Sequence, residues 1–297
     1  MALRLLLVRH GLSSFNLEKR IQGRNDLSTL SSEGIKQANL TGKALADISI
    51  DFVYSSPLQR AAETTKHIQL ARENKLGTNF DQLLLEVDLP SWSGLTTQEV
   101  QERFPEDFMK WKKDPGEVLL KRENGESFQP IKELMDQAKN FLSNLIQKHN
   151  SDSKKTILIV AHNAILKCLI LNLLSKESEG FRKLRLDNTS ISIFNIQGNL
   201  KNNYQTQIEC LNSTAHLIEP LPKNQRFARV ILVRHGETDW NLQGRFQGQI
   251  DIPLNENGKS QAFSVQKFLK SVKLDKAFSS SMQRPIQTAK IILECHP

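Results

Sequence analysis

The chain repeats part of its own sequence, and this repeat limits the folds that it can adopt. The segment LeuLeuValArgHisGly at 6–11 returns as IleLeuValArgHisGly at 231–236. The same offset, or one residue less after a single deletion, relates further pairs: Asn16 and Asn241, Gln22 and Gln247, Gly23 and Gly248, Asp26 and Asp251, Arg60 and Arg284, and Thr64 and Thr288. A match sustained over this length indicates a duplicated structural unit. The second copy stops at Pro297.

The repeat predicts two domains and a linker. Residues 1–211 form a complete domain, residues 212–228 a linker, and residues 229–297 a truncated second copy. The linker contains Pro220 and Pro222 within a polar stretch that has neither helical nor alternating apolar periodicity. A copy that ends at Pro297 lacks several strands of its sheet, which leaves an open edge and an incomplete core. We therefore expect that the second copy ends at the limit of a truncated gene model or of a cloned fragment, and not as an evolved half-domain.

Apolar runs and amphipathic stretches alternate along the first copy. They predict strands at 3–8, 51–55, 82–86, 157–160, 190–196 and 204–210, and helices at 32–47, 57–71, 96–112, 127–149 and 164–174. This alternation is typical of an α/β fold with three αβα layers, in which a mostly parallel sheet carries helices on both faces. Ligands of such sheets bind beyond the carboxyl ends of the strands.

The formal charge of +8 and the isoelectric point near 9.3 leave several anionic partners open. The basic clusters at 154–155 and 182–185 are short and lack the interleaved aromatic residues of single-stranded nucleic-acid sites. We interpret the charge as solvated helix faces and expect no nucleic-acid partner. The apolar run Leu5–Val8 is too short to span a membrane, so no membrane association is expected either.

The cysteines predict neither disulfides nor a metal site. Cys168, Cys210 and Cys295 are odd in number, far apart and without metal-ligand spacing. This pattern favours the reducing cytoplasm as the compartment.

Several polar residues directly follow predicted strands. Arg9, His10 and Gly11 follow the first, Arg60 begins the helix after the second, and His162 follows the strand at 157–160. A glycine lets the backbone approach an anion closely, and arginine offers a planar fork of donors. Considered alone, a histidine after a strand usually makes a structural hydrogen bond. Arg60 alone would usually form an ion pair at the surface. Taken together, two histidines and two arginines at three strand ends predict a site for a phosphate dianion.

A neutral imidazole in such a pocket can act as a nucleophile toward phosphorus while the arginines stabilise the equatorial charge. No metal ion or cofactor is then required. The leaving oxygen needs a proton donor, for which Glu86 is the first candidate and Asp88 the second.

These residues resemble the motifs of the histidine phosphatase superfamily, also called phosphoglycerate mutase-like. The resemblance covers residues 4 to 211 and rests on the following motif residues: Arg9, His10 and Gly11; Asn16, Gln22 and Gly23; Ser55, Ser56, Arg60 and Thr64; Glu86, Trp92 and Gly94; Gly125, Glu126 and Ser127; and His162. It implies that His10 is the nucleophile, that Glu86 is the general acid and base, and that Arg9, Arg60 and His162 bind the phosphate. Asn16, Gln22, Gly23 and Asn163 are then the expected substrate-binding residues.

Two departures from the family pattern concern the substrate rather than the phosphoryl transfer. Leu12 and Ser13 stand where the family has GluThr, and ProSerTrpSerGly at 90–94 replaces the usual GlyXTrpGluGly. The stretch between Glu86 and His162 is shorter than in the mutases, which favours a phosphatase over a phosphoglycerate mutase. The amino-acid sequences of several segments resemble those of plant-type 2-carboxy-D-arabinitol-1-phosphatases and their cyanobacterial relatives. A small phosphorylated metabolite, such as a sugar phosphate or a sugar-acid phosphate, is the expected partner.

The partial copy keeps only part of the constellation. It contains Arg234, His235, Asn241 and Arg284, but residues 229–297 hold no counterpart of Glu86 or His162. We interpret these residues as a vestigial site. The alternative is a non-catalytic half-domain that binds phosphate or dimerises, and the sequence leaves a homodimer open.

Overall fold

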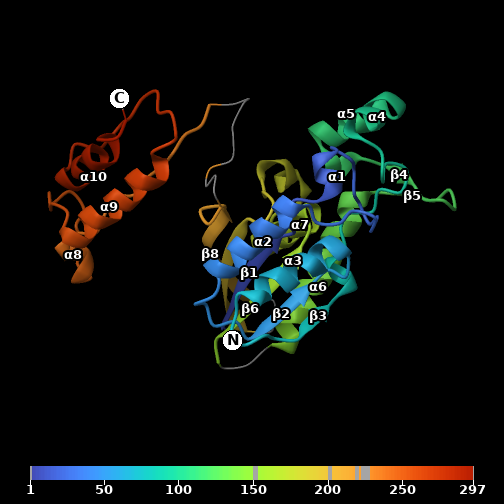
Figure 1. Cartoon of the computed structure of the whole chain (residues 1–297), viewed down its shortest axis with the longest axis horizontal. Coiled ribbons are helices and arrows are strands. Elements are labelled where there is room, and N and C mark those ends of the chain that lie inside the picture. Colours follow the sequence, from blue (N-terminus) through green and yellow to red (C-terminus); the bar gives the residue numbers. More distant parts are fainter. Residues whose placement is uncertain (1, 150–152, 200–202, 218–220, 222–227, 297) are drawn as a thin grey trace. The chain divides into compact units, whose positions relative to one another are not determined.

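The structure is a computed structural model that describes residues 2–149, 153–199, 203–217, 221 and 228–296. It separates into two compact units, Met1–Pro222 and Lys223–Pro297 (Figure 1). Each unit is described below by itself.

The larger unit is built on a sheet of six strands. These are β1 (Ala2–Arg9), β2 (Phe52–Ser55), β3 (Thr78–Phe80), β6 (Lys155–Ala161), β7 (Ile191–Asn199) and β8 (Asn203–Ser213), in the spatial order β3-β2-β6-β1-β7-β8. The four strands from β3 to β1 are parallel, whereas β7 runs antiparallel to both of its neighbours, β1 and β8. Parallel strands need crossover connections, and the helices between them provide these connections.

Helices cover both faces of this sheet, as the alternation in β1 requires (Figure 1). Leu3, Leu5 and Leu7 join one buried cluster with residues of α6 (Pro130–Lys148) and α7 (Asn163–Leu173). Leu6 and Val8 join a second cluster on the opposite face. There, Leu45 and Ile68 come from the helical region of α2 (Ser32–Ala44) and α3 (Gln59–Leu70). The predicted three-layer α/β class is therefore confirmed.

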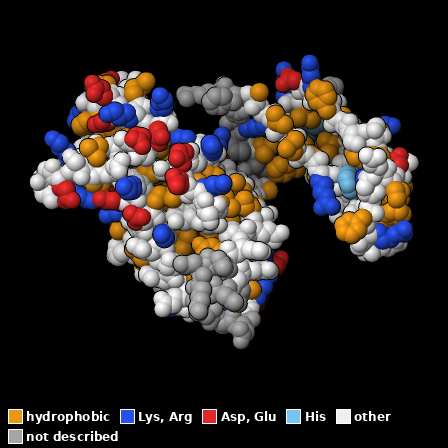
Figure 2. Space-filling model, turned by 180° about the vertical axis from the view of Figure 1, so that it is seen from behind, with side chains coloured by type: hydrophobic (Ala, Val, Ile, Leu, Met, Phe, Trp, Pro, Cys, Tyr) orange, Lys and Arg blue, Asp and Glu red, His pale blue; other side chains and the backbone are white. Residues whose placement is uncertain are grey.

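The remaining elements of this unit are short. They are α1 (Ser14–Leu17), α4 (Thr97–Arg103), α5 (Pro105–Lys113), the hairpin β4 (Leu120–Lys121) and β5 (Ser127–Phe128), and the 3₁₀ turns η1 (Gln82–Leu84), η2 (Pro115–Glu117) and η3 (Ser178–Lys183). Among the described residues, no helix is both long and apolar enough to cross a membrane. Charged side chains of both signs are interspersed on the face of this unit that Figure 2 shows.

Two expectations about secondary structure were wrong. The strand predicted at 82–86 lies earlier, at 78–80, because the Asp81 side chain accepts a hydrogen bond from the Leu83 N–H and turns the chain into η1. The helix predicted at 96–112 is two helices that part at Phe104. Its φ of −133° and ψ of 55° are not helical, since the following Pro105 disfavours the α conformation in its predecessor.

The smaller unit contains three helices among its described residues: α8 (Asp239–Leu242), α9 (Glu256–Leu269) and α10 (Gln283–Leu293). A small core forms around Leu254, Ala262, Leu269 and Ile292. The apolar segment at 230–233 has no strand partner among the described residues, and Leu232 is 91% exposed. Hydrophobic side chains gather on the visible surface of this unit (Figure 2).

Candidate active site

The predicted site residues lie at the carboxyl edge of the parallel strands. His10 directly follows β1, Arg60 is the second residue of α3 after β2, and His162 follows β6 as the N-cap of α7. Because β2, β6 and β1 are adjacent and parallel, their carboxyl ends meet at one edge. The rings of His10 and His162 lie with centroids 5.2 Å apart.

The His10 imidazole is held in one tautomer. Its Nδ1 lies 2.8 Å from the carbonyl oxygen of Gly11, which can only accept, so Nδ1 carries the proton and donates. The lone pair is then on Nε2. Burial, followed by the charges of Arg9 and Arg60, holds the pKa of His10 well below its usual value, and the bond to Gly11 only partly opposes this. His10, 2% exposed, therefore presents a neutral imidazole with a free nitrogen lone pair at neutral pH.

The second histidine is fully buried. His162 Nε2 lies 2.7 Å from Ser56 Oγ, and its Nδ1 has no hydrogen-bond partner in the structure described here. Burial is the first cause that lowers the pKa of His162 well below its usual value, followed by the charges of Arg60, His10 and Arg9. A buried nitrogen without a partner is costly unless a ligand completes it. Nδ1 is thus available to a ligand atom.

Arg60 is completely buried without a carboxylate ion pair among the described residues. Its two terminal nitrogens each donate over 2.9 Å, to the carbonyl oxygens of Asn25 and Gly23, which leaves Nε without a partner. Burial lowers the pKa of Arg60 to about 10, while the nearby charges of Glu86 and Asp26 raise it. Backbone carbonyls orient this guanidinium but do not neutralise it, so Arg60 keeps a positive charge that can bind an anion.

In the part of the chain that the structure describes, Arg9 is likewise held by a backbone carbonyl and not by a carboxylate. One terminal nitrogen donates over 2.8 Å to the Leu186 carbonyl oxygen, and Nε has no partner among the described residues. Burial lowers the pKa of Arg9, and the charges of Glu86 and Asp187 partly restore it. The charges of both arginines act on both imidazoles.

Glu86 follows η1, not a strand as the sequence suggested, and it reaches the site from that turn. Its carboxylate accepts hydrogen bonds of 3.0–3.1 Å from the N–H groups of Val87, Ala164 and Ile165. The last two belong to the first turn of α7, where a carboxylate is favoured by the helix dipole. This places Glu86 beside the start of the helix that His162 caps.

The second acid candidate is occupied elsewhere. Asp88 lies 3.3 Å from Arg122 and 4.0 Å from Arg24, at the rim of the site. Arg122 also pairs with Glu133 over 2.7 Å. This network favours Glu86 over Asp88 as the acid.

The four expected substrate-binding residues lie in different parts of the site. Asn16 and Gln22 are linked through Ser13, whose Oγ lies 3.0 Å from Asn16 Oδ1 and 3.1 Å from Gln22 Oε1. Gly23 adopts a positive φ of 50° and turns its carbonyl toward Arg60. In this structure Gly23 orients the arginine. Asn163, half-buried, is the first residue of α7.

Sequence reasoning missed one residue of this region, Asn188. Its amide donates over 2.9 Å to the carbonyl oxygen of His10 and over 3.2 Å to Asn16 Oδ1. Asn188 lies in the loop before β7, far from the other motifs in sequence, and no local pattern marks it. Thr64, which the motif comparison did include, accepts from the Gly11 N–H over 3.0 Å and so fixes the loop after β1.

The partial copy repeats these local contacts. His235 Nδ1 lies 2.7 Å from the Gly236 carbonyl oxygen, and Arg284 donates over 2.9 Å to the carbonyl oxygens of Gly248 and Ile250. Asn241 forms the same capping box as Asn16. Arg234, however, is exposed, whereas Arg9 is half-buried. His235, Asn241 and Arg284 thus make the same local contacts as their counterparts in the larger unit, whereas the burial of Arg9 is not matched at Arg234.

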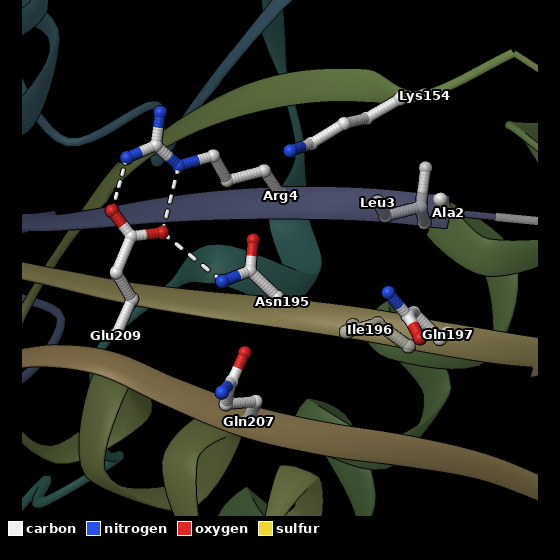
Figure 3. Close-up of a pocket in the computed structure, with 9 residues that line it drawn as sticks. All are labelled: Ala2, Leu3, Arg4, Lys154, Asn195, Ile196, Gln197, Gln207 and Glu209. Carbon is white, nitrogen blue, oxygen red and sulfur yellow. Dashed lines mark hydrogen bonds and ion pairs between the residues drawn. The ribbon is translucent and has the colours of Figure 1, made fainter. Parts of the chain in front are cut away.

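A separate pocket of about 370 Å³ lies at the opposite end of β1. It is lined by Ala2, Leu3, Arg4, Lys154, Asn195, Ile196, Gln197, Gln207 and Glu209 (Figure 3). Glu209 pairs with Arg4 and accepts from the Asn195 amide over 3.0 Å, so the strongest charges of this pocket are already matched. This ion pair joins strands of the sheet, and it is not part of the histidine site.

Comparison with known proteins identifies the family. The model of the histidine phosphatase superfamily (branch 1) matches residues 5–206 and again residues 230–297. This chain belongs to the histidine phosphatase superfamily. The resemblance inferred from the motifs is therefore confirmed.

Relatives of this histidine phosphatase include enzymes named for different substrates. It is 30% identical over 299 residues to 2-carboxy-D-arabinitol-1-phosphatase of Triticum aestivum, a match that covers 99% of the chain but 58% of the wheat protein. It is 32% identical over 216 residues to phosphoserine phosphatase 1 of Hydrogenobacter thermophilus, which covers 73% of the chain and 95% of that protein. The chain thus spans little more than half the length of its wheat relative.

A solved structure extends the comparison. The phosphoserine phosphatase of Entamoeba histolytica in complex with 3-phosphoglyceric acid matches with a TM-score of 0.59 and 29% identity, over 73% of the chain and all of that protein. The matched share is close to the size of the larger unit.

Proposed function

We propose that the larger unit is a phosphomonoesterase that works through a phosphohistidine on His10. The observation that carries this proposal is the state of His10: a neutral imidazole, fixed by Gly11, with a free lone pair on Nε2 and with the charges of Arg9 and Arg60 acting on it. In the first step Nε2 bonds to phosphorus as the bond from phosphorus to the leaving oxygen breaks, and protonated Glu86 gives its proton to that oxygen. In the second step a water oxygen bonds to phosphorus, the nitrogen–phosphorus bond breaks, and Glu86 takes up the proton.

Arg9, Arg60 and His162 bind the transferring phosphoryl group in this scheme. Their partnerless nitrogens, Arg9 Nε, Arg60 Nε and His162 Nδ1, supply donors for the equatorial oxygens. Asn16 in α1, Gln22 in the loop that follows and Asn163 at the start of α7 bind the substrate in this scheme. The positive charge already present lets the reaction proceed without a metal ion or cofactor.

The substrate that we propose is a small phosphorylated metabolite, with a sugar-acid phosphate such as 2-carboxyarabinitol 1-phosphate as the first candidate. The wheat relative carries that name, and the Entamoeba relative was solved with 3-phosphoglyceric acid. Both compounds join a carboxylate to a phosphate monoester. A phosphoglycerate mutase is the second candidate, because the superfamily is also called phosphoglycerate mutase-like and transfer back to substrate uses the same phosphohistidine.

A hydrolysis screen separates these functions. The purified chain is incubated with 2-carboxyarabinitol 1-phosphate, phosphoserine, 3-phosphoglycerate and sugar phosphates, with and without EDTA. We expect release of inorganic phosphate that EDTA does not reduce. Formation of 2-phosphoglycerate without phosphate release would instead establish a mutase, and loss of turnover in chelator that magnesium or zinc restores would refute metal independence.

We also propose that residues 229–297 are a second, non-catalytic copy of the same domain. Arg60 and Arg284 donate equivalent hydrogen bonds to two backbone carbonyls each, which supports a duplication. The exposed apolar side chains of this unit, including Phe246 and Phe278, suit association with another polypeptide, such as a second copy in a homodimer. Free thiols at Cys168, Cys210 and Cys295 suit a reducing, cytoplasmic setting.

A further inference from the structure

A lysine that the proposed mechanism does not use is buried one helical turn from the site. Lys167 lies on α7, four residues after Asn163, and is 7% exposed. Helical side chains slant toward the N-terminus of their helix, so Lys167 is directed toward the turn that holds the Glu86 carboxylate. Its charge interacts with those of Glu86 and Arg9. Lys167 therefore lies on the same helix as Asn163, close enough to Glu86 and Arg9 for their charges to act on it.

A second cation lies beside this lysine. Lys167 Nζ is 4.8 Å from the centroid of the Phe181 ring, and the Arg182 guanidinium is 6.0 Å from the same centroid. Arg182 also lies over the Trp111 ring at 5.5 Å and donates to the Trp111 carbonyl oxygen. Lys167 comes from α7, Trp111 from α5, and Phe181 with Arg182 from η3. Two elements, α7 and η3, thus bring two cations to the Phe181 ring, and α5 adds the Trp111 ring beside Arg182.

The two cations have no acidic partner of their own. Neither forms an ion pair with a carboxylate among the residues that the structure describes. Like charges held together are unfavourable, and an aromatic face offsets this only in part. Such a pair is stabilised when an anion binds between or beside the two groups. Arg182 is exposed whereas Lys167 is buried, so the pair runs from the surface inward.

We propose that Lys167, assisted by Arg182 at the rim, binds a carboxylate of the substrate while Arg9 and Arg60 hold its phosphate. This assignment rests on the proposed phosphatase function and adds the residue that selects phosphorylated carboxylic acids over neutral phosphate esters. The ammonium supplies a charge-assisted hydrogen bond that a hydroxyl group in place of the carboxylate does not match.

The protonation of Lys167 provides a second signature. Burial lowers the pKa of Lys167 to about 8, helped by the charges of Arg182 and Arg9 and opposed by those of Glu86 and Cys168. The carboxylate preference should therefore weaken as the pH rises from 7 to 9. An arginine at this position stays charged throughout that range.

The test compares two esters with one skeleton, 3-phosphoglycerate and glycerol 3-phosphate, which differ by a carboxylate against a hydroxymethyl group. The readout is the ratio of kcat/KM for the two esters. In Lys167→Met, this ratio should fall roughly tenfold to a hundredfold, the cost of losing a charge-assisted hydrogen bond. Lys167→Arg should keep the ratio and remove its decline between pH 7 and 9.

A matched control removes a lysine that lies over an aromatic ring elsewhere. Lys148 Nζ is 5.4 Å from the Tyr54 ring centroid, on α6, and Lys148→Met should leave the ratio unchanged. A ratio that Lys167→Met does not alter, in a variant with the parental melting temperature, would overturn the carboxylate site alone. Failure of the unaltered chain to release phosphate from these two esters and from every other compound of the hydrolysis screen would instead overturn the proposed phosphatase function.

Discussion

The two ArgHisGly segments share their local contacts but differ in their surroundings. In the larger unit, β1 lies between β6 and β7, and Leu7 is 2% exposed. In the smaller unit, the equivalent Leu232 is 91% exposed and its segment has no strand partner among the described residues. Yet His10 and His235 make the same bond to the carbonyl of the next glycine. The local sequence is therefore sufficient for these hydrogen bonds, whereas burial of the site requires the whole sheet.

This difference has a chemical consequence. Desolvation is the main cause of the lowered pKa of both His10 and His162, and it depends on the enclosing sheet and helices. Glu86 is likewise held by α7, an element that follows β6. Residues 229–297 keep the local hydrogen bonds and can present a histidine and an arginine. They have neither the acid nor the second imidazole.

Equivalent substitutions in the two copies provide the strongest contrast. Lysine retains the charge of Arg60, but its single nitrogen replaces the planar fork whose separate nitrogens reach two backbone carbonyls and the phosphoryl group. We expect Arg60→Lys to reduce kcat/KM by roughly a hundredfold or more. Arg284→Lys removes the same fork from the smaller unit and should leave kcat/KM unchanged. Equal losses in the two variants, measured with melting temperatures as a control for folding, would contradict the assignment.

The pH dependence of stability tests whether the imidazoles are truly enclosed. His10 and His162 stay neutral in the folded chain below the pH at which unfolded histidines bind protons, near 6.5. The free energy of unfolding should therefore fall as the pH drops below 6.5, by up to about 1.4 kcal/mol per pH unit for each histidine. His162→Gln should lessen this slope in denaturant titrations between pH 7 and 5. An unchanged slope would mean that His162 is protonated in the folded chain.

The smallest effect is expected from removing the smaller unit. A chain that ends at residue 222 should keep its kcat/KM per site within about twofold, because a separate unit contributes little to the core of its neighbour. Ending near residue 212 would be a poorer choice, since Thr214 is buried and His216 lies 3.0 Å from Thr41 Oγ1. Kinetics, melting temperature and sedimentation of both chains measure this. A large loss of activity at unchanged melting temperature would show that the smaller unit takes part in catalysis.

The positions of some site residues could be predicted from the sequence, and those of others could not. Strand ends bearing Arg9, His10, Arg60 and His162 were predictable, because parallel order follows from alternating strands and helices and places these residues at one edge. The site of Glu86 was not, since its carboxylate depends on N–H groups 78 residues away. Asn188 escaped for the same reason: its contacts with the His10 loop are long-range and leave no periodic or motif signal.

The break at Phe104 was visible in principle. Pro105 follows it directly, and the residue before a proline disfavours the helical conformation. An amphipathic pattern that continued across the break concealed it. The edge strand at 78–80 was harder to find, because only three residues pair with β2 and most of their surface faces solvent.

The most direct test locates the phosphoryl group itself. The full chain is mixed with ³²P-labelled substrate, quenched rapidly in alkali and digested, and the label is assigned to a peptide. We expect a base-stable, acid-labile label on His10 only, which His10→Ala abolishes together with at least a thousandfold loss of turnover, on the order expected for a lost covalent nucleophile. His235→Ala should leave both intact. Label on His235, or turnover that survives in His10→Ala, would contradict catalysis by the larger unit.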